Sequence, residues 1–239
     1  MSVYTISDCG RERTSNEDNS INYFNTNFSL LLVADGMGGH LAGEIASKMA
    51  CEACQAYIVE HKNRDDYASL LRESIEYAND LIYKKSQEDP NCSGMGTTIV
   101  SCIVADNKVY IANVGDSRLY IYSDELKLIT KDHSIIFNLV EEGVISLDEA
   151  RFHPGKNAIT RAVGTEDKIN VDLFEKDIKE GDYILLCTDG LTNLVSENEM
   201  IDVLESESDV KDMCENLVYI ANENGGHDNI TVTIFRNRS

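Results

Sequence analysis

The chain has 239 residues, 42% of them apolar, which is enough to fill the core of one large α/β domain or of two small ones. Its 42 acidic residues against 21 basic ones give a formal net charge of −21, which argues against nucleic acid as a partner. The apolar runs at 30–34 and 99–105 are far shorter than the roughly 20 residues that cross a bilayer, and no charged segment followed by an apolar one begins the chain, so we expect a protein without a membrane span.

Strands are predicted where short runs are rich in Val, Ile, Tyr and Thr. In chain order the predicted strands are 3–6, 28–34, 97–105, 108–114, 118–122, 183–187 and 230–235. The junctions at 106–107 and 115–117 are short and consist of turn-forming residues. We therefore expect the middle third of the chain to be an antiparallel meander without crossover helices.

Helical periodicity occupies four blocks, at 42–60, 65–86, 196–205 and 209–222. Ser196 followed by Glu199 is a capping box for the third block. Strands and helices segregated in this way predict an α+β protein in which antiparallel sheets pack together and helices cover their outer faces. We expect one domain over 1–239, with an irregular segment at about 142–165 that is long enough to be a functional flap.

Seven cysteines are an odd number without the spacing of a disulfide framework, so we expect a cytoplasmic protein. Cys51 and Cys54 form a CxxC pair, but no second pair or nearby histidine completes a zinc site. Because both lie inside the predicted helix 42–60, we expect them to pack as small apolar side chains.

Carboxylates recur where predicted strands end. Asp35 and Asp189 each follow an apolar strand and precede a glycine, and Asp116 closes a third such run. Asp228 stands just before the last strand. In antiparallel sheets the end of one strand lies beside the start of its neighbour, so these four carboxylates could meet at one edge.

Carboxylates gathered at one edge raise one another's pKa unless cations neutralise them. Oxygen ligands from Asp, backbone carbonyls and water select hard ions such as Mg²⁺ or Mn²⁺. Two such ions, roughly 4 Å apart, could position a shared water for attack on phosphorus. Any single Asp-Gly after a strand is also ordinary turn chemistry, and the metal interpretation rests on the set of four.

The order of motifs resembles the PP2C-type family of metal-dependent protein phosphatases, in its bacterial form. The match runs in order from about residue 5 to residue 235. Its segments are Arg13-x-x-Asn16-Glu17-Asp18, Val33-Ala34-Asp35-Gly36-Met37-Gly38-Gly39-His40, Gly96-Thr97-Thr98, Asn113-Val114-Gly115-Asp116-Ser117-Arg118, Asp132-His133-Ser134, Thr160-Arg161-Ala162-Val163-Gly164, Thr188-Asp189-Gly190-Leu191 and Asp228-Asn229-Ile230-Thr231.

The resemblance implies a four-layer α-β-β-α sandwich of two antiparallel sheets with a binuclear Mn²⁺ or Mg²⁺ centre at one end. In that arrangement Asp35 bridges both ions, the Gly36 carbonyl binds one of them, and Asp189 and Asp228 bind the other. Glu17 and Asp18 take part directly or through water, and Asp116 helps to hold a third, weaker ion.

Two further roles are less directly transferred. Arg13 is implied to clamp the substrate phosphate, which suits the fork geometry of a guanidinium, although a surface ion pair with Glu12 or Glu17 is the alternative. His40 could protonate the departing alkoxide or could hold local structure. Many eukaryotic members carry the histidine directly after Asp-Gly, where this chain has Met37. For His133 and His227 we expect turn or packing roles.

The expected activity is a protein serine/threonine phosphatase, with direct attack of metal-activated water or hydroxide and no phosphoenzyme. Cys187 is not a candidate nucleophile because no CxxxxxR loop is present. The GxxxxGK[ST] motif is also absent, which argues against an NTPase. The rivals are a signalling protein that has lost turnover and a hydrolase of small phosphate esters or nucleotides. The implied partners are phosphoproteins, including a cognate Ser/Thr kinase, and we expect a monomer.

Overall fold

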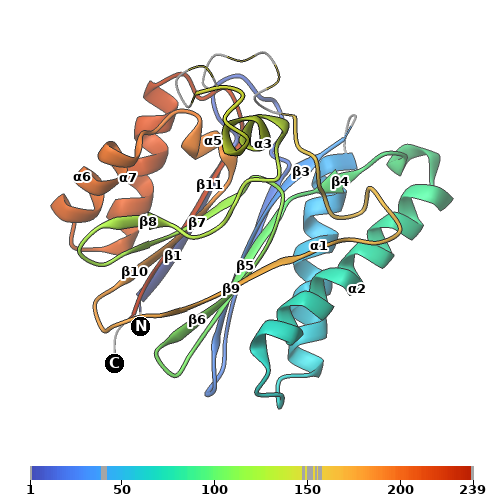
Figure 1. Cartoon of the computed structure of the whole chain (residues 1–239), viewed down its shortest axis with the longest axis horizontal. Helices are drawn as coiled ribbons and strands as arrows, with labels where there is room; N and C mark the ends of the chain where they lie inside the picture. Colours follow the sequence, from blue (N-terminus) through green and yellow to red (C-terminus); the bar gives the residue numbers. More distant parts are fainter. Residues whose placement is uncertain are drawn as a thin grey trace.

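Two antiparallel sheets packed face to face form the centre of the molecule, and helices cover both outer faces (Figure 1). The computed structural model describes residues 2–38, 42–146, 149, 153, 155 and 158–237. This is the four-layer α-β-β-α sandwich that the sequence predicts. Within the described part of the chain, no helix is both long and apolar enough to cross a membrane.

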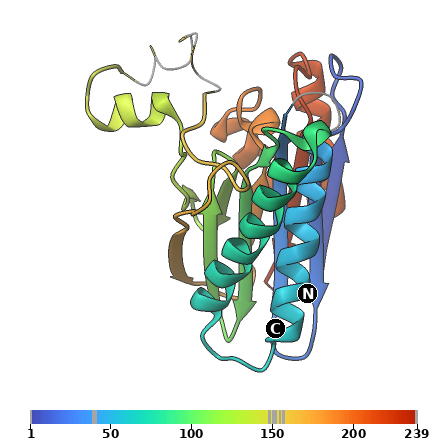
Figure 2. The same cartoon turned by 90° about the vertical axis from the view of Figure 1, so that its right-hand side faces the viewer.

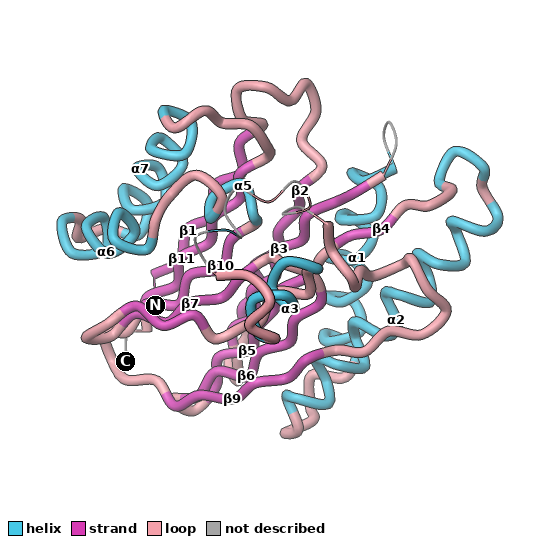
Figure 3. Tube along the Cα trace, turned by 45° about the horizontal axis from the view of Figure 1, so that its top comes forward, coloured by secondary structure: helices cyan, strands magenta, loops and turns pink. Residues whose placement is uncertain are grey.

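The two sheets have different strand orders, and every strand pair in them is antiparallel. One sheet has the order β1-β11-β10-β7-β8, formed by β1 (Ser2–Asp8), β7 (Arg118–Tyr122), β8 (Leu126–Leu128), β10 (Tyr183–Cys187) and β11 (Ile230–Arg236). The other has the order β2-β3-β5-β6-β9 with β4 paired to the end of β3, formed by β2 (Asp18–Phe24), β3 (Ser29–Met37), β4 (Gly96–Thr97), β5 (Ile99–Ala105), β6 (Lys108–Val114) and β9 (Asp172–Asp177). Figure 3 shows both sheets with the top of the molecule tilted toward the viewer.

The helices divide between the two sheets. Helices α1 (Ala42–Glu60) and α2 (Tyr67–Glu88) lie side by side over the β3 sheet, with the short η1 (Pro90–Cys92) after them (Figure 2). The short α5 (Asp189–Thr192), α6 (Glu197–Ser206) and α7 (Val210–Glu223) cover the β11 sheet. The capping box predicted at Ser196 and Glu199 starts α6. Helix α3 (Ile135–Glu141) stands apart, beyond the ends of the strands (Figure 2).

Strand β3 shows how the layers are held together, because it is buried on both faces. Leu31 and Val33 point into the layer between the sheets. Leu30, Leu32 and Ala34 point the other way, into the layer under α1 and α2. Alternation with a period of two therefore places one continuous apolar run in two cores at once, which fixes the register of the strand.

The predicted meander is only partly correct. Asp106 and Asn107, both with positive φ, do join β5 to β6 as a hairpin. The next junction, at 115–117, does not join neighbouring strands: β6 pairs with β9, and β7 belongs to the other sheet. Gly115 has φ +105°, and a Cβ there would lie 2.6 Å from Thr98, so the chain crosses between the sheets where only glycine fits.

Candidate active site

The sheet topology brings the predicted carboxylates to one end of the sandwich, opposite the chain termini in Figure 1. Asp18 begins β2 and is paired in register with Asp35 in β3. Asp189 follows β10 directly, and Asp228 stands just before β11, its antiparallel partner. Asp116 lies in the crossing between β6 and β7. One detail of the prediction is wrong: β3 continues to Met37, so Asp35 and Gly36 lie within the strand and not after it.

These carboxylates act on one another electrostatically. Burial and the negative charges of Asp18, Asp189, Asp116 and Asp228 hold the pKa of Asp35 well above its ordinary value. Burial raises the pKa of Asp18 to about 7, and burial with the charge of Asp189 raises that of Asp116 to about 7. Burial and then the charge of Asp228 raise the pKa of Asp189. Asp18 is buried and the other four are only partly buried, so the cluster is open to solvent on one side.

A chain of hydroxyl groups orients Asp18. Its Oδ2 accepts hydrogen bonds from Thr188 Oγ1 (2.9 Å) and from Thr231 Oγ1 (2.7 Å). Because Thr231 gives its only hydroxyl hydrogen to Asp18, Ser7 Oγ must donate to Thr231 Oγ1 at 2.8 Å, and Asn16 Nδ2 in turn donates to Ser7 Oγ. Two hydrogen bonds, supported by two more behind them, thus fix Oδ2 of Asp18, while its Oδ1 is buried without a hydrogen-bond partner.

The backbone of Asp35 is held equally firmly. Its N–H donates to Thr98 Oγ1 (2.9 Å), and its carbonyl accepts from Thr97 Oγ1 and from the Thr98 N–H, both at 2.8 Å. Gly36 N–H donates to the Glu17 carbonyl at 3.1 Å. A Cβ on Gly36 would lie 2.1 Å from the Gly43 carbonyl oxygen, so only glycine allows α1 to pack against this end of β3.

Arg13 and Glu17 lie on the loop between β1 and β2, beside the cluster. Arg13 Nη2 donates to Asp228 Oδ2 at 2.9 Å and its side chain is 55% exposed, so a cation stands at the open side of the carboxylates. The alternative ion pair with Glu12 does not form; Glu12 contacts His227 Nδ1 at 2.7 Å. Burial raises the pKa of Glu17, and the charge of Arg13 acts in the opposite direction.

The carboxylate oxygens of the cluster, two of which have no hydrogen-bond partner, are suited to bind hard cations. Oδ1 of Asp18 and Oδ1 of Asp189 are both buried without a hydrogen-bond partner, which is costly for a carboxylate that has no cation to bind. No three acidic, histidine or cysteine side chains of the described residues form a ready protein-only cage. Mg²⁺ and Mn²⁺ do not need one, because carbonyls and water complete their coordination, so carboxylates from one side fit them.

A second polar network stands behind the crossing at Gly115. His133 Nδ1 accepts the Gly115 N–H at 2.9 Å, and its Nε2 lies 3.2 Å from Asp172 Oδ2. Burial lowers the pKa of His133, and Arg161 Nη1 lies 3.0 Å from the same Nε2. Arg161 donates to Asp172 Oδ1 at 2.7 Å. These contacts are the turn role predicted for His133.

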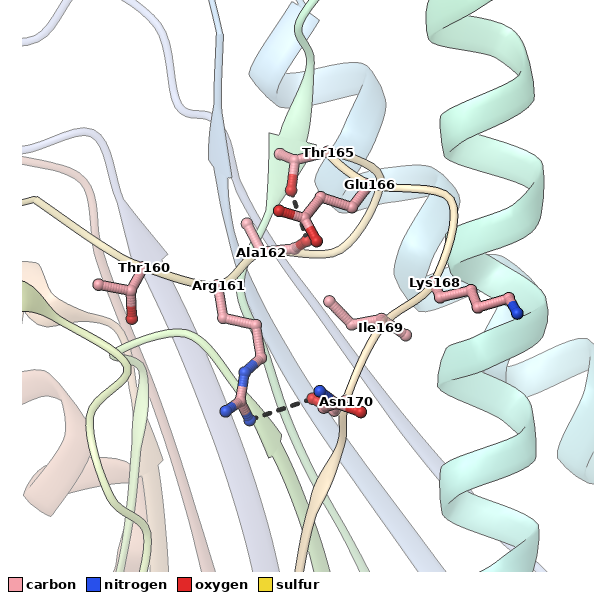
Figure 4. Close-up of a pocket in the computed structure, with 8 residues that line it drawn as sticks. All are labelled: Thr160, Arg161, Ala162, Thr165, Glu166, Lys168, Ile169 and Asn170. Carbon is pink, nitrogen blue, oxygen red and sulfur yellow. Dashed lines mark hydrogen bonds between the residues drawn. The ribbon is translucent and has the colours of Figure 1, made fainter.

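One cavity of about 180 Å³ lies at the end of the predicted flap and the turn after it (Figure 4). The Arg161 side chain extends toward Asn170 and donates to its carbonyl at 3.1 Å, while Lys168 points away from the cavity, toward α2 (Figure 4). The cavity is lined by Thr160, Arg161, Ala162, Thr165, Glu166, Lys168, Ile169 and Asn170, none of which is a predicted metal ligand.

Sequence reasoning assigned no role to the residues that orient the carboxylates. Thr98, Thr188, Thr231 and Asn229 all belong to the matched motifs. Thr188, Asn229 and Thr231 lie within three residues of Asp189 or Asp228, whereas Thr98 has no functional candidate near it in the sequence. Their position was the available signal, but hydroxyl and amide contacts are visible only in the fold. His40 lies outside the described residues.

Comparisons with known proteins all indicate one family. The family model described as Protein phosphatase 2C matches residues 8–231. The serine/threonine phosphatase stp of Listeria welshimeri is 41% identical over 232 residues, covering 95% of this chain and 92% of that protein. The crystal structure of the serine/threonine phosphatase Stp1 from Staphylococcus aureus has a TM-score of 0.94 at 36% identity, covering 99% of this chain and 95% of that one. The catalytic domain of the serine/threonine protein phosphatase PstP, in complex with two manganese ions, has a TM-score of 0.87 at 34% identity, covering 98% and 96%.

Proposed function

The chain belongs to the protein phosphatase 2C family and is a protein serine/threonine phosphatase, and from this premise we propose that the carboxylate cluster at the end of the sandwich is its catalytic metal centre. The observation that carries the proposal is the pair of buried, unpartnered carboxylate oxygens on Asp18 and Asp189, within a group of carboxyls that raise one another's pKa.

Two divalent ions, Mn²⁺ or Mg²⁺, are the proposed cofactors. Asp35 and the Gly36 carbonyl, with Asp189 and Asp228, are the proposed ligands; Asp18 and Glu17 take part directly or through water, and Asp116 serves a third, weaker ion. The two manganese ions of PstP support a pair of divalent ions as the cofactor. Bound there, such ions supply Lewis acidity toward the phosphoryl group and a nucleophile drawn from water at neutral pH.

The protein's own groups bind and orient the phosphoester. Arg13 is exposed, cationic and beside the cluster, and we assign it to the substrate phosphate, whose oxygens suit its fork of N–H donors. No side chain is needed as a nucleophile. Cys187, next to the site in sequence, is buried, and burial raises its pKa to about 12, so it remains a thiol at neutral pH and no phosphoenzyme is proposed.

His40 is the proposed acid that gives a proton to the departing alkoxide, and a role in local structure is the alternative. The two roles differ in their dependence on the leaving group, because p-nitrophenolate departs without protonation. As the acid, His40→Ala slows phosphothreonine hydrolysis far more than p-nitrophenyl phosphate hydrolysis; equal losses on both substrates would support the structural role.

Phosphoproteins are the proposed substrates, including a cognate Ser/Thr kinase whose marks the enzyme reverses. The flap at about 142–165, part of which lies outside the described residues, is proposed to select among substrates, because α3, which precedes it in the chain, lies at the same end of the sandwich as the carboxylates (Figure 1). A single domain, a monomeric state and a cytoplasmic location complete the proposal.

The test is metal-dependent hydrolysis of a phosphothreonine peptide. Purified protein should release phosphate in the presence of Mn²⁺ or Mg²⁺ and stop when EDTA removes the metal. Activity that survives thorough chelation would refute the metal mechanism. A kcat/KM for a nucleoside monophosphate equal to that for the peptide would favour a hydrolase of small esters instead.

A further inference from the structure

The loop of residues 9–17, which carries Arg13, lies against the segment 226–229 that precedes β11. In Figures 1 and 2 this blue loop runs beside the red C-terminal part of the chain. The N–H groups of Arg11 and Glu12 both donate to the Gly226 carbonyl, at 2.7 Å and 3.2 Å. A Cβ on Gly10 would lie 2.2 Å from the Asp228 carbonyl oxygen, so the two segments are in close backbone contact.

Asn229 closes this contact with its side chain. Its Nδ2 donates to the carbonyls of Cys9 (3.0 Å) and Ser15 (2.9 Å), and its Oδ1 accepts the N–H of Glu17 (2.8 Å). The orientation of the amide is unambiguous, since the reversed group would set its NH₂ against a backbone N–H. Asn229 is 6% exposed, so these three hydrogen bonds are made away from water and join both ends of the loop.

Asn229 also connects the loop to Asp228. The backbone N–H of Asn229 donates to Asp228 Oδ1 at 2.9 Å, while Arg13 Nη2 donates to Asp228 Oδ2. Within the loop, Cys9 Sγ contacts the Arg13 carbonyl at 3.3 Å. Cys9, which Asn229 holds in place, is therefore in direct contact with the backbone of Arg13. The arginine side chain is 55% exposed, so the loop backbone and the hydrogen bond to Asp228 together decide where the guanidinium stands.

We propose that Asn229 is a positioning residue for phosphate binding: by joining Cys9, Ser15 and Glu17 it sets the loop so that the Arg13 guanidinium faces the substrate phosphate. This inference rests on the phosphate-binding role proposed for Arg13. Asn229 touches neither substrate nor metal, and its contribution passes through the arginine.

The chain offers a matched control. Asn79, on α2, is 1% exposed and holds a different loop through the same pattern of bonds. Its Oδ1 accepts the Gly164 N–H at 2.8 Å, and its Nδ2 donates to the carbonyls of Glu166 (3.0 Å) and Asp167 (3.5 Å). Replacing either asparagine by alanine leaves three backbone groups without their partner, so the general cost to stability is similar.

The experiment is a double-mutant cycle with Arg13→Ala, measured as KM for a phosphothreonine peptide and as inhibition by inorganic phosphate, with Mn²⁺ present. Arg13→Ala raises both constants on the order of tenfold, the value of about one charge-assisted hydrogen bond. Asn229→Ala raises them by a comparable factor alone, and adds little in the Arg13→Ala background. Asn79→Ala, whatever its own effect, combines additively with Arg13→Ala.

Hydrogen exchange supplies a readout independent of turnover, with EDTA present. Asn229→Ala accelerates exchange in the segment 9–17 and leaves 164–167 unchanged, and Asn79→Ala does the reverse. Should Asn229→Ala fail to fold, Asn229→Gln keeps the amide on a longer stem that cannot make all three bonds, and it shows the same effects to a smaller degree.

The outcomes separate the two proposals. If Arg13→Ala leaves KM and phosphate inhibition unchanged, the phosphate role of Arg13 fails. If Arg13→Ala raises both but Asn229→Ala is fully additive with it, or does not change exchange in 9–17, the positioning role of Asn229 is overturned while the role of Arg13 stands.

Discussion

Asp18 and Asp189 share an unusual state: each is held by the fold through one oxygen, and the other oxygen is buried without a partner. Burial of an unpaired carboxylate oxygen costs free energy, and the protein reinforces that arrangement with Thr188 and Thr231 on Asp18. A local loss of stability of this kind is typical of a ligand-binding site.

Removing one carboxylate should therefore separate activity from stability. Asp189→Asn is expected to lower kcat by more than about 100-fold, because even the partners of metal ligands cost 10–100-fold when replaced. Measured in EDTA, its free energy of unfolding should rise, because the neutral amide no longer meets the charge of Asp228.

Asp182 provides the matched control at the other end of β10. It is buried and accepts the Lys179 N–H at 2.7 Å, far from the carboxylate cluster along the strand. Asp182→Asn should leave kcat unchanged and should not stabilise the protein. Near-normal turnover in Asp189→Asn would show that our ligand assignment is wrong.

Among the elements, the crossing from β6 to β7 has a special position, because it carries Asp116 from one sheet to the other. Gly115 turns the chain there and packs on Thr98, whose Oγ1 accepts the Asp35 N–H and contacts Ser117 Oγ at 2.7 Å. Thr98 stands between β4 and β5, so the crossing and β3 meet at the hydroxyl group of a residue that joins these two strands. A change in this turn is transmitted to two proposed ligands.

Gly115→Ala and Gly181→Ala form a pair that isolates this packing. Both glycines have similar positive φ, +105° and +96°, but only Gly115 has a neighbour within 4 Å of a new Cβ. Gly181→Ala is expected to cost roughly 1–2 kcal/mol from backbone strain alone. Gly115→Ala adds the clash with Thr98, about 1–3 kcal/mol more, and lowers activity as well. The free energies of unfolding of the two variants are compared by urea denaturation. Equal losses would mean that Thr98 moves aside at no cost and that the clash contributes nothing.

Over the whole molecule the dominant electrostatic feature is an excess of negative charge, −21 in all. Five carboxyl groups act on one another at the proposed metal site. The pKa values of Asp18 and Asp116 rise to about 7 in the folded protein, from 3.8 in the unfolded chain. At a pH between these values, the folded state holds protons that the unfolded state has released. Stability therefore falls as pH rises through this window.

This sign predicts how metal and pH act together. In EDTA, the free energy of unfolding should decrease from about pH 4 to about pH 7. Mn²⁺ binds the ionised carboxylates of the folded state, so added Mn²⁺ should raise stability most at the upper end of that range. Chemical denaturation at several pH values tests this, with Asp18→Asn as the control whose slope is flatter. A metal-free protein that becomes more stable toward pH 7 would contradict it.

The sequence predicted what local patterns determine. Helix α1 and strands β6, β7 and β10 have the predicted bounds, because their periodicity and residue types agree with their final environment. Strand β2 escaped prediction because Asn19, Ser20 and Asn22 are poor strand formers, and its register comes from β3. Strand β9 is an exposed, charged edge that only pairing with β6 identifies as a strand.

For the site, the sequence by itself determined which acidic residues could gather at one end of the molecule, since strand ends and motif order are local features. The tertiary structure decided how they are held. The threonines behind Asp18, the passage between sheets at Gly115 and the three bonds of Asn229 join residues as much as 220 positions apart in the chain. Hydrogen bonds over such separations depend on the register of the two sheets, which no local pattern contains.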